Sequence, residues 1–427
     1  MMKEQKRVPN LRFAEFSGEW ATASLQDLCR KTISYGIVQT GENIEKGIPC
    51  VRVVDLTSFK LDVSNMIKTS KKVSDSNKKT ILEENEIMLA LRGEIGLVRL
   101  VEKELVGANL TRGVARISTK ESIVTPSFMN WVLQSENSII NINKKVNGSA
   151  LKEIPLSALR KVKVFFSKTI EEQQKIASFL STVDKKIQQL QQKNSLLEQY
   201  KKGVMQQLFP SAGSGQVPQL RFTREDGSTY PDWEEKRLGE IGEFQTSSVD
   251  KLSKPDEKEV FLVNYMDVYN HNEINNETVK EYQIVTANDN QIKSCDLRKG
   301  DVLFTPSSET PDDIGHSVVI FEDIENAVYS YHVLRFRPNI ELDILYSHYF
   351  CNNNDVLRQL SRMATGSTRF TISKGNFSKV VIKLPNIEEQ TQIAQFLSSI
   401  DKKIAVVQTQ IEHTQQFKKG LLQQMFV

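Results

Sequence analysis

The chain has 427 residues, of which 39% are hydrophobic and 26% charged, and its formal net charge at pH 7 is +3. These values are typical of a folded protein and exclude a disordered or collagen-like chain. No apolar run approaches the roughly 18 residues of a membrane span, and the start lacks a signal-peptide pattern, so we expect a cytoplasmic protein with no membrane partner. The four cysteines are far apart in the sequence, which excludes a disulfide framework.

Residues 1–168 are predicted to form a mixed α/β domain, domain 1, with a net charge of +9. Short β-rich runs at 47–56, 87–91 and 98–101 are separated by turns, and a helical pattern covers 127–133. The segment 169–209 is predicted to be one long helix, because apolar residues recur at alternating steps of four and three. The predicted coiled-coil seam consists of Ile176, Leu180, Val183, Ile187, Leu190 and Leu197.

A segment rich in glycine and serine, 210–216, is predicted to be a flexible linker. A second mixed domain, domain 2, comes next at 217–386 and has a net charge of −8, so the two domains differ in electrostatic character. Its β-rich runs lie at 260–266, 318–321 and 333–336, and its helical pattern lies at 342–351.

Residues 387–427 are predicted to form a second long helix. The segment 387–426 aligns without a gap on 170–209, with 21 identities in 40 positions. Its seam consists of Ile393, Leu397, Ile400, Ile404, Val407 and Ile411. We expect the two seams to cover each other in an antiparallel coiled coil. The alternative is that each helix packs on its own globular domain, but the recurrence of exposed lysines and glutamines favours a shared outside partner.

The repeat extends beyond the helices. The segment VPNLRF at 8–13 matches VPQLRF at 217–222, Trp20 falls opposite Trp233, and each helix is preceded by a Gly-Ser dipeptide. The sequence therefore predicts an α+β protein with two mixed α/β domains in a pseudo-two-fold repeat. Two long helices that form an antiparallel coiled coil separate these domains.

No catalytic motif is found in the sequence. It contains no phosphate-binding loop, dinucleotide-binding glycine motif, nucleophile elbow, zinc-protease motif or amino-methyltransferase Asn/Asp-Pro-Pro-aromatic motif. Asp232, Glu234 and Lys236 superficially resemble a nuclease set, but they are crowded together and the first copy lacks two of them. The five histidines are not at metal-ligand spacing. We expect neither catalytic residues nor a metal site in this chain.

Both domains become basic around their Gly-Ser dipeptide, which indicates a surface for nucleic-acid phosphates. An ordinary solvated charged surface is the alternative, although recurrence in both copies disfavours it. The candidate DNA-binding residues are Lys71, Lys72, Arg92, Arg112, Lys144, Lys145, Ser149, Arg358, Arg362, Ser367, Thr368, Arg369 and Lys374.

The order of domain, helix, domain and repeated helix resembles the specificity subunit (HsdS) of type I restriction-modification enzymes. The motif IEEQ…IA-x-FLS-x-[VI]-DKKI, the opening P-x-LRF with a tryptophan and the Gly-Ser dipeptides carry this resemblance over the whole chain. It implies two target recognition domains, each reading one half of a bipartite double-stranded DNA site. It also implies that the helices set the spacer and dock two methyltransferase (modification) subunits.

The resemblance further implies that this chain binds no cofactor and catalyses nothing. S-adenosylmethionine, ATP and Mg are expected on partner subunits, including restriction or motor subunits, within a complex that methylates adenine N6 and restricts DNA with ATP. Two other interpretations stay open from the residues alone. They are a stand-alone pseudo-dimeric DNA-binding regulator and a coiled-coil scaffold with two ligand-binding domains.

Overall fold

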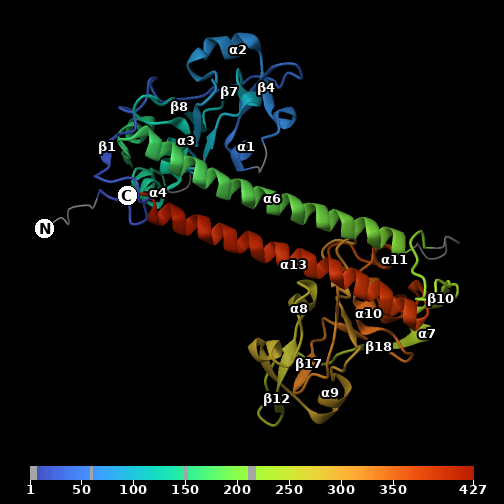
Figure 1. The fold of residues 1–427 in the computed structure, drawn as a ribbon. Helices are drawn as coiled ribbons and strands as arrows, with labels where there is room; N and C mark the ends of the chain where they lie inside the picture. The colour runs from blue at the N-terminus through green and yellow to red at the C-terminus, as the bar shows by residue number, and fades with distance from the viewer. Residues whose placement is uncertain (1–6, 58–60, 149–151, 210–217) are drawn as a thin grey trace. The chain divides into compact units, whose positions relative to one another are not determined.

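The computed structural model describes residues 7–57, 61–148, 152–209 and 218–427. The predicted linker at 210–216 and the candidate residue Ser149 lie outside the described residues. The chain divides into two compact units (Figure 1): unit 1 is Met1–Lys193 with Val407–Val427, and unit 2 is Asn194–Val406. Each unit therefore contains one globular domain and a part of both long helices.

Domain 1 is built on a four-stranded sheet of order β2-β8-β5-β6, a three-stranded sheet β4-β3-β7 and a strand pair β1-β9. The strands are β1 (Ala21–Ser24), β2 (Ser34–Tyr35), β3 (Ile48–Val51), β4 (Ile67–Thr69), β5 (Ile87–Ala90), β6 (Val98–Leu100), β7 (Asn109–Leu110), β8 (Val114–Ile117) and β9 (Lys163–Phe166). The α-helices are α1 (Val53–Thr57), α2 (Lys71–Ser76), α3 (Pro126–Gln134), α4 (Glu136–Asn143) and α5 (Leu156–Arg160), with 3-10 turns at Val63–Asn65, Lys78–Thr80 and Lys103–Leu105.

Domain 2 repeats these sheets in the orders β11-β18-β14-β16, β13-β12-β17 and β10-β20, and adds a short pair β15-β19. The strands are β10 (Glu234–Arg237), β11 (Gly242–Thr246), β12 (Lys258–Val263), β13 (Ile284–Ala287), β14 (Val302–Phe304), β15 (Ser307–Ser308), β16 (Ser317–Val319), β17 (Ala327–Tyr329), β18 (Leu334–Pro338), β19 (Phe370–Thr371) and β20 (Val381–Leu384). The helices are α7 (Leu238–Ile241), α8 (Tyr265–Tyr269), α9 (Asp289–Ser294), α10 (Ile344–Cys351), α11 (Asn354–Met363) and α12 (Lys374–Phe377), with a 3-10 turn at Thr278–Glu281.

Two of the predicted β-rich runs, 47–56 and 260–266, change from strand to helix before they end. β3 ends at Val51 and β12 at Val263, and the short helices α1 and α8 come next. Valine-rich sequence favours a strand here, but an aspartate caps each helix. Asp55 accepts the backbone N–H of Arg52 at 2.7 Å, and Asp267 accepts that of Asn264 at 2.8 Å. These local hydrogen bonds override the β propensity in both copies.

The long helices are α6 (Ile170–Leu208) and α13 (Ile387–Gln424). They run antiparallel within each unit. In unit 1, Asp184 near the start of α6 pairs with Lys418 near the end of α13 at 2.5 Å. In unit 2, Asp401 on α13 pairs with Lys201 on α6 at 2.6 Å. The two ion pairs are equivalent under the repeat, as the predicted fold requires.

The predicted seam residues are shielded from solvent to different degrees. The buried members are Ile176, Leu180, Ile187, Leu190, Ile393, Leu397, Ile400, Val407 and Ile411. Val183, Leu197 and Ile404 are half-buried. The helix starts also pack on their own domains, because one core cluster joins Ile176 and Leu180 to domain 1 and to Met425 at the end of α13. Each domain core is therefore completed by the start of one helix and the end of the other.

The opening P-x-LRF motif fastens each domain to the long helices. Arg12 binds the carboxylate of Glu172 in the first turn of α6 at 2.6 and 2.8 Å. Leu11 N–H donates to the carbonyl of Gln424 at the end of α13. In unit 2, Arg221 binds Glu389 in the same way. Within the part of the chain that the structure describes, no helix is long and apolar enough to cross a membrane.

Candidate functional site

Backbone pairing flanks the Gly-Ser dipeptide in both domains, and in domain 2 it forms a tight hairpin. The bridges lie between Asn147 and Glu153 in domain 1 and between Thr365 and Thr371 in domain 2. Gly366 has φ +147°, and a Cβ there would lie 2.1 Å from the carbonyl oxygen of Arg369. Only glycine fits this position, so the hairpin requires the residue that the sequence supplies.

In domain 2 the hairpin borders a pocket of about 390 Å³. Arg369 reaches across β15 and donates from Nη2 to Ser307 Oγ at 3.3 Å. Lys374, Tyr331 and His332 line the same pocket. Burial, with the nearby charges of Arg369 and of a lysine, lowers the pKa of His332. The pocket is thus basic at its rim and aromatic on one wall. Ser367 and Thr368 are exposed in the hairpin itself.

In domain 1 the corresponding region is arranged around Arg92. Arg92 forms an ion pair with Glu153 at 2.8 Å, and Glu153 is bridged to Asn147 through the backbone. Arg112 is exposed in the turn before β8, and the next residue, Gly113, lies under the side chain of Arg92. Arg92 therefore lies between Glu153 and the turn that carries Arg112.

The other candidate DNA-binding residues are dispersed. Lys71 and Lys72 are exposed on α2, where Lys71 pairs with Asp75. Lys144 and Lys145 line a separate groove at the end of α4. That groove also contains Lys161 and Lys163, which the sequence analysis did not select. Arg362 is exposed on α11.

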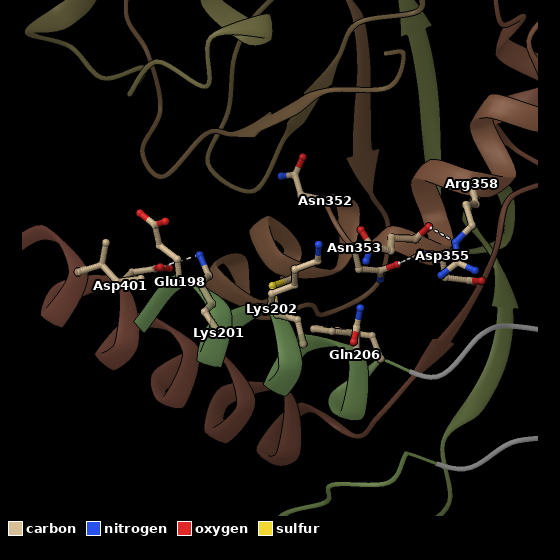
Figure 2. A pocket seen from close by; sticks show the side chains of 13 residues that line it. Glu198, Lys201, Lys202, Gln206, Asn352, Asn353, Asp355, Arg358 and Asp401 are labelled. Carbon is tan, nitrogen blue, oxygen red and sulfur yellow. Dashed lines mark hydrogen bonds and ion pairs between the residues drawn. The ribbon is translucent and has the colours of Figure 1, made fainter. Parts of the chain in front are cut away.

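Arg358 lies apart from Arg369, in a second surface groove of about 560 Å³ (Figure 2). We call this the unit 2 groove. Its helix residues include Glu198, Lys201, Lys202, Met205, Asp401 and Ile404, and its domain residues include Asn352, Asn353, Asp355 and Arg358. Figure 2 shows Lys201 directed at Asp401. The Tyr349 hydroxyl donates to Asp401 at 2.7 Å, and Lys201 Nζ lies 5.4 Å from the centre of its ring.

Unit 1 has an equivalent groove, the unit 1 groove, of about 830 Å³. It contains Gln415, Lys418, Lys419, Leu422, Asp184 and Ile187. These six residues occupy the repeat positions of the six helix residues named above for the unit 2 groove. An aromatic residue again covers the lysine of the ion pair, since Lys418 Nζ lies 4.9 Å from the ring of Trp131. The two grooves therefore share six equivalent helix positions, although each is also lined by helix residues that the other lacks.

Two of the histidines form a polar cluster in domain 2. The Tyr269 hydroxyl donates to Asp313, which also contacts His316 at 2.9 Å, and His316 lies 3.2 Å from His271. Burial lowers the pKa of His271. Among the residues that the structure describes, no group of three or more His, Cys, Asp or Glu side chains could hold a metal ion.

Comparison with known proteins relates this architecture to one family. The family described as type I restriction modification DNA specificity domain matches residues 17–199 and 230–415, once for each copy of the repeat. The chain belongs to this family. It is therefore a type I restriction-modification specificity subunit with two target recognition domains and acts as a non-catalytic component. The resemblance inferred from the repeated helix motif is confirmed.

Curated members of the specificity family share modest identity with the chain. The MjaVIII specificity subunit of Methanocaldococcus jannaschii is 25% identical over 363 residues, covering 83% of this chain and 81% of that protein. The putative MjaX specificity subunit of the same organism is 23% identical over 443 residues, covering 98% and 95%. The EcoBI specificity subunit of Escherichia coli is 28% identical over 155 residues, so the chain matches 32% of that relative's length.

Solved structures of the specificity family share the fold. The S subunit of the type I restriction-modification system from M. genitalium aligns with a TM-score of 0.56 at 14% identity, covering 98% of this chain and 99% of that chain. A chain from a structure on complex assembly and conformational transition of the type I system aligns with a TM-score of 0.56 at 15% identity, covering 94% and 96%. The predicted α+β fold with two repeated domains is confirmed.

Proposed function

We propose that domain 1 and domain 2 each read one half of a bipartite, asymmetric site in double-stranded DNA. The observation that carries this proposal is that both domains have the same arrangement of sheets, which we call the frame, but differ in their surfaces. The strand orders of the two domains are the same, yet their net charges are +9 and −8 and their exposed turns differ. Two unlike domains on one chain fit two unlike half-sites, whereas a symmetric site would need two identical domains.

Two methyltransferase subunits dock on the helices in this proposal, one at each groove. The unit 1 and unit 2 grooves present the same ion pair, a second exposed lysine and an apolar residue at equivalent positions. The lining from the domains differs, so the helix residues are the features common to both grooves. Two copies of one partner need two copies of one surface, and exposed Lys202 and Lys419 favour a partner with acidic side chains there.

The remaining roles fall to partner subunits. The methyltransferase subunits bind S-adenosylmethionine and methylate adenine N6, and restriction or motor subunits use ATP and Mg. The chain itself then supplies sequence recognition in the cytoplasm, where DNA is accessible. The continuous α6, 39 residues long, gives a span of roughly 58 Å along which the spacing of two half-sites is fixed.

Exchange of one domain tests the proposal. Residues 230–385 are replaced by the equivalent domain of another specificity subunit, with both long helices kept because their ends complete the domain cores. Genome-wide mapping of N6-methyladenine then compares the hybrid with the natural chain, each co-expressed with the same methyltransferase. We expect one half-site to change and the other half-site and the spacer to persist. Methylation of an unchanged site, or replacement of both half-sites, would contradict the proposal.

A further inference from the structure

The two domains can be compared position by position, because their strand registers are equivalent. Ile87 pairs with Ile117 in domain 1, and Val302 pairs with Phe336 in domain 2. Five residues before Ile117 lies Arg112, and five residues before Phe336 lies Tyr331. By the same register, Gly113 is equivalent to His332, and Arg92 is equivalent to Ser307. All these residues lie where the central strands enter or leave the sheet.

Interior positions of this frame keep their role in both copies. Leu56 and Val268 are both fully buried in the short helix that comes after the first paired strand. Arg116 and Arg335 are both buried on the central strand, next to acidic partners. The capping aspartates of α1 and α8 also coincide. Equivalent exposed positions therefore lie at the same place on the sheets of both domains.

Exposed positions of the frame differ in chemistry. The turn before the central strand carries exposed Arg112 in domain 1, whereas domain 2 carries Tyr331, which is 51% exposed. The neighbouring short helix exposes Val54 in domain 1 and Met266 in domain 2. Among the described residues, no hydrogen bond or ion pair holds the Arg112 guanidinium, so its donors face solvent.

Beside the turn, the large and the small side chain of domain 1 are replaced in domain 2 by a small and a large one. A Cβ on Gly113 would lie 3.3 Å from Cγ of Arg92, so the arginine side chain covers the glycine in domain 1. Domain 2 has the small Ser307 in place of that arginine and the large His332 in place of the glycine. The ring of His332 lies 3.9 Å from that of Tyr331, and Arg369 brings a cation to Ser307 from the hairpin. Each domain thus fills the same space with a different set of donors.

We infer that this turn, Arg112–Gly113 in domain 1 and Tyr331–His332 in domain 2, reads base edges in each half-site. The inference rests on the proposed function, in which each domain reads one half-site. Phosphate contacts carry no sequence information and need not differ between two domains, whereas base contacts must. An exposed guanidinium suits the O6 and N7 acceptors of guanine in the major groove. A tyrosine hydroxyl, an imidazole and their ring faces suit a different base pattern.

Transplanting the domain 1 side chain into domain 2 tests the inference. Tyr331→Arg places in domain 2 the residue that domain 1 carries at the same exposed position, so the frame accommodates it. The assembled complex with its methyltransferase subunits selects duplexes from a random-sequence library, and the bound duplexes are sequenced. We expect one or two positions of a single half-site to gain a guanine preference of about 5- to 150-fold, with the other half-site unchanged.

The reciprocal variant and two controls complete the experiment. Arg112→Tyr should remove a base preference of similar size from the other half-site. Phe321→Ala and Lys103→Ala, at exposed positions outside the turns, should leave both half-sites unchanged.

An unchanged motif with both turn variants overturns the inference, and so does a uniform decrease of affinity with the motif intact, because that result indicates phosphate contacts. Selection of no bipartite motif by the natural chain would instead overturn the proposed function itself.

Discussion

The guanidinium of Arg12 and the carboxylate of Glu172 form a two-pronged ion pair, although 160 residues separate them in the sequence. The side chains are only 13% and 1% exposed, and Ser167 also donates to Glu172. Arg221 and Glu389 form the same pair in unit 2. The opening P-x-LRF motif is thus explained by its contact with the first turn of each long helix.

Removal of Arg12 should destabilise unit 1. Arg12→Ala leaves the Glu172 carboxylate buried without its cation, which costs about 3 kcal/mol of unfolding free energy. Glu15→Ala is the matched control, because Glu15 pairs with Lys175 at the exposed surface, where solvent screens the pair and its contribution to stability is small. Urea unfolding of both variants measures the difference. Equal destabilisation by the two variants would show that the Arg12 pair has no special role.

Substitution of the hairpin glycine should disrupt the DNA surface of domain 2. Gly366→Ala puts a Cβ against the Arg369 carbonyl at a positive φ, and such strain costs about 1–3 kcal/mol. Gly375→Ala in α12 is the control, because the nearest atom to its Cβ is 3.9 Å away. We expect weaker DNA binding by the first variant only. Equal DNA affinities of the two variants, measured on the assembled complex, would show that the hairpin takes no part in DNA recognition.

The cations of the 358–374 segment should divide into two functional groups. Arg369→Ala with Lys374→Ala should make the salt dependence of DNA binding shallower, by about 0.9 in the log–log slope for each phosphate that the protein no longer neutralises. Arg358→Ala should leave this slope unchanged and weaken methyltransferase binding, because Arg358 lines the unit 2 groove. Titration of binding against salt concentration decides between them. A slope that changes only with Arg358→Ala would reverse the assignment.

Each groove should bind one methyltransferase independently. Lys202→Glu reverses an exposed charge in the unit 2 groove, and Lys419→Glu does so at the equivalent position in unit 1. With either single variant, native mass spectrometry should show complexes that have lost one methyltransferase subunit. With the double variant, both methyltransferase subunits should be lost. Lys186→Glu and Lys403→Glu, at exposed equivalent positions outside the grooves, are the controls. Full assembly of the double variant would exclude the grooves as docking sites.

The fold was largely predictable, because the long helices carry a gapless repeat and an apolar period that survive in the sequence. The match between the two seams was enough to predict the antiparallel arrangement. The ion pairs of Lys201 and Lys418 were not predictable, since a seam pattern specifies which face is buried but not which charged residues meet across it. The strand-to-helix switch before Asp55 also escaped prediction, because a single capping carboxylate outweighed a run of valines.

The candidate DNA-binding residues were harder to predict. Arg358 and Arg369 are close in sequence, yet α11 ends between them. Arg358 lies on the helix and lines a groove, whereas Arg369 lies beyond the helix in a hairpin. Tyr331 and His332, which only the further inference selects, are not among the sequence candidates because similarity between the domains is faint there. Only the strand register aligns Tyr331 with Arg112, so the signal is structural rather than local in the sequence.

The central claim is that two independent recognition domains are spaced by one helix pair, and insertion into that pair tests it most directly. The Asp184–Lys418 and Asp401–Lys201 pairs fix the register, and the repeat then places its symmetry point after Gln192 on α6 and after Thr409 on α13. Four residues inserted at both points lengthen each helix by about 6 Å and rotate the C-terminal part of each helix by about 40°.

Genome-wide mapping of N6-methyladenine with this double-insertion chain gives the answer. At about 3.4 Å per base pair, the account predicts that both half-site sequences persist while the unread spacer grows by one or two base pairs. Altered half-sites, or an unaltered spacer in a folded and active complex, would contradict it.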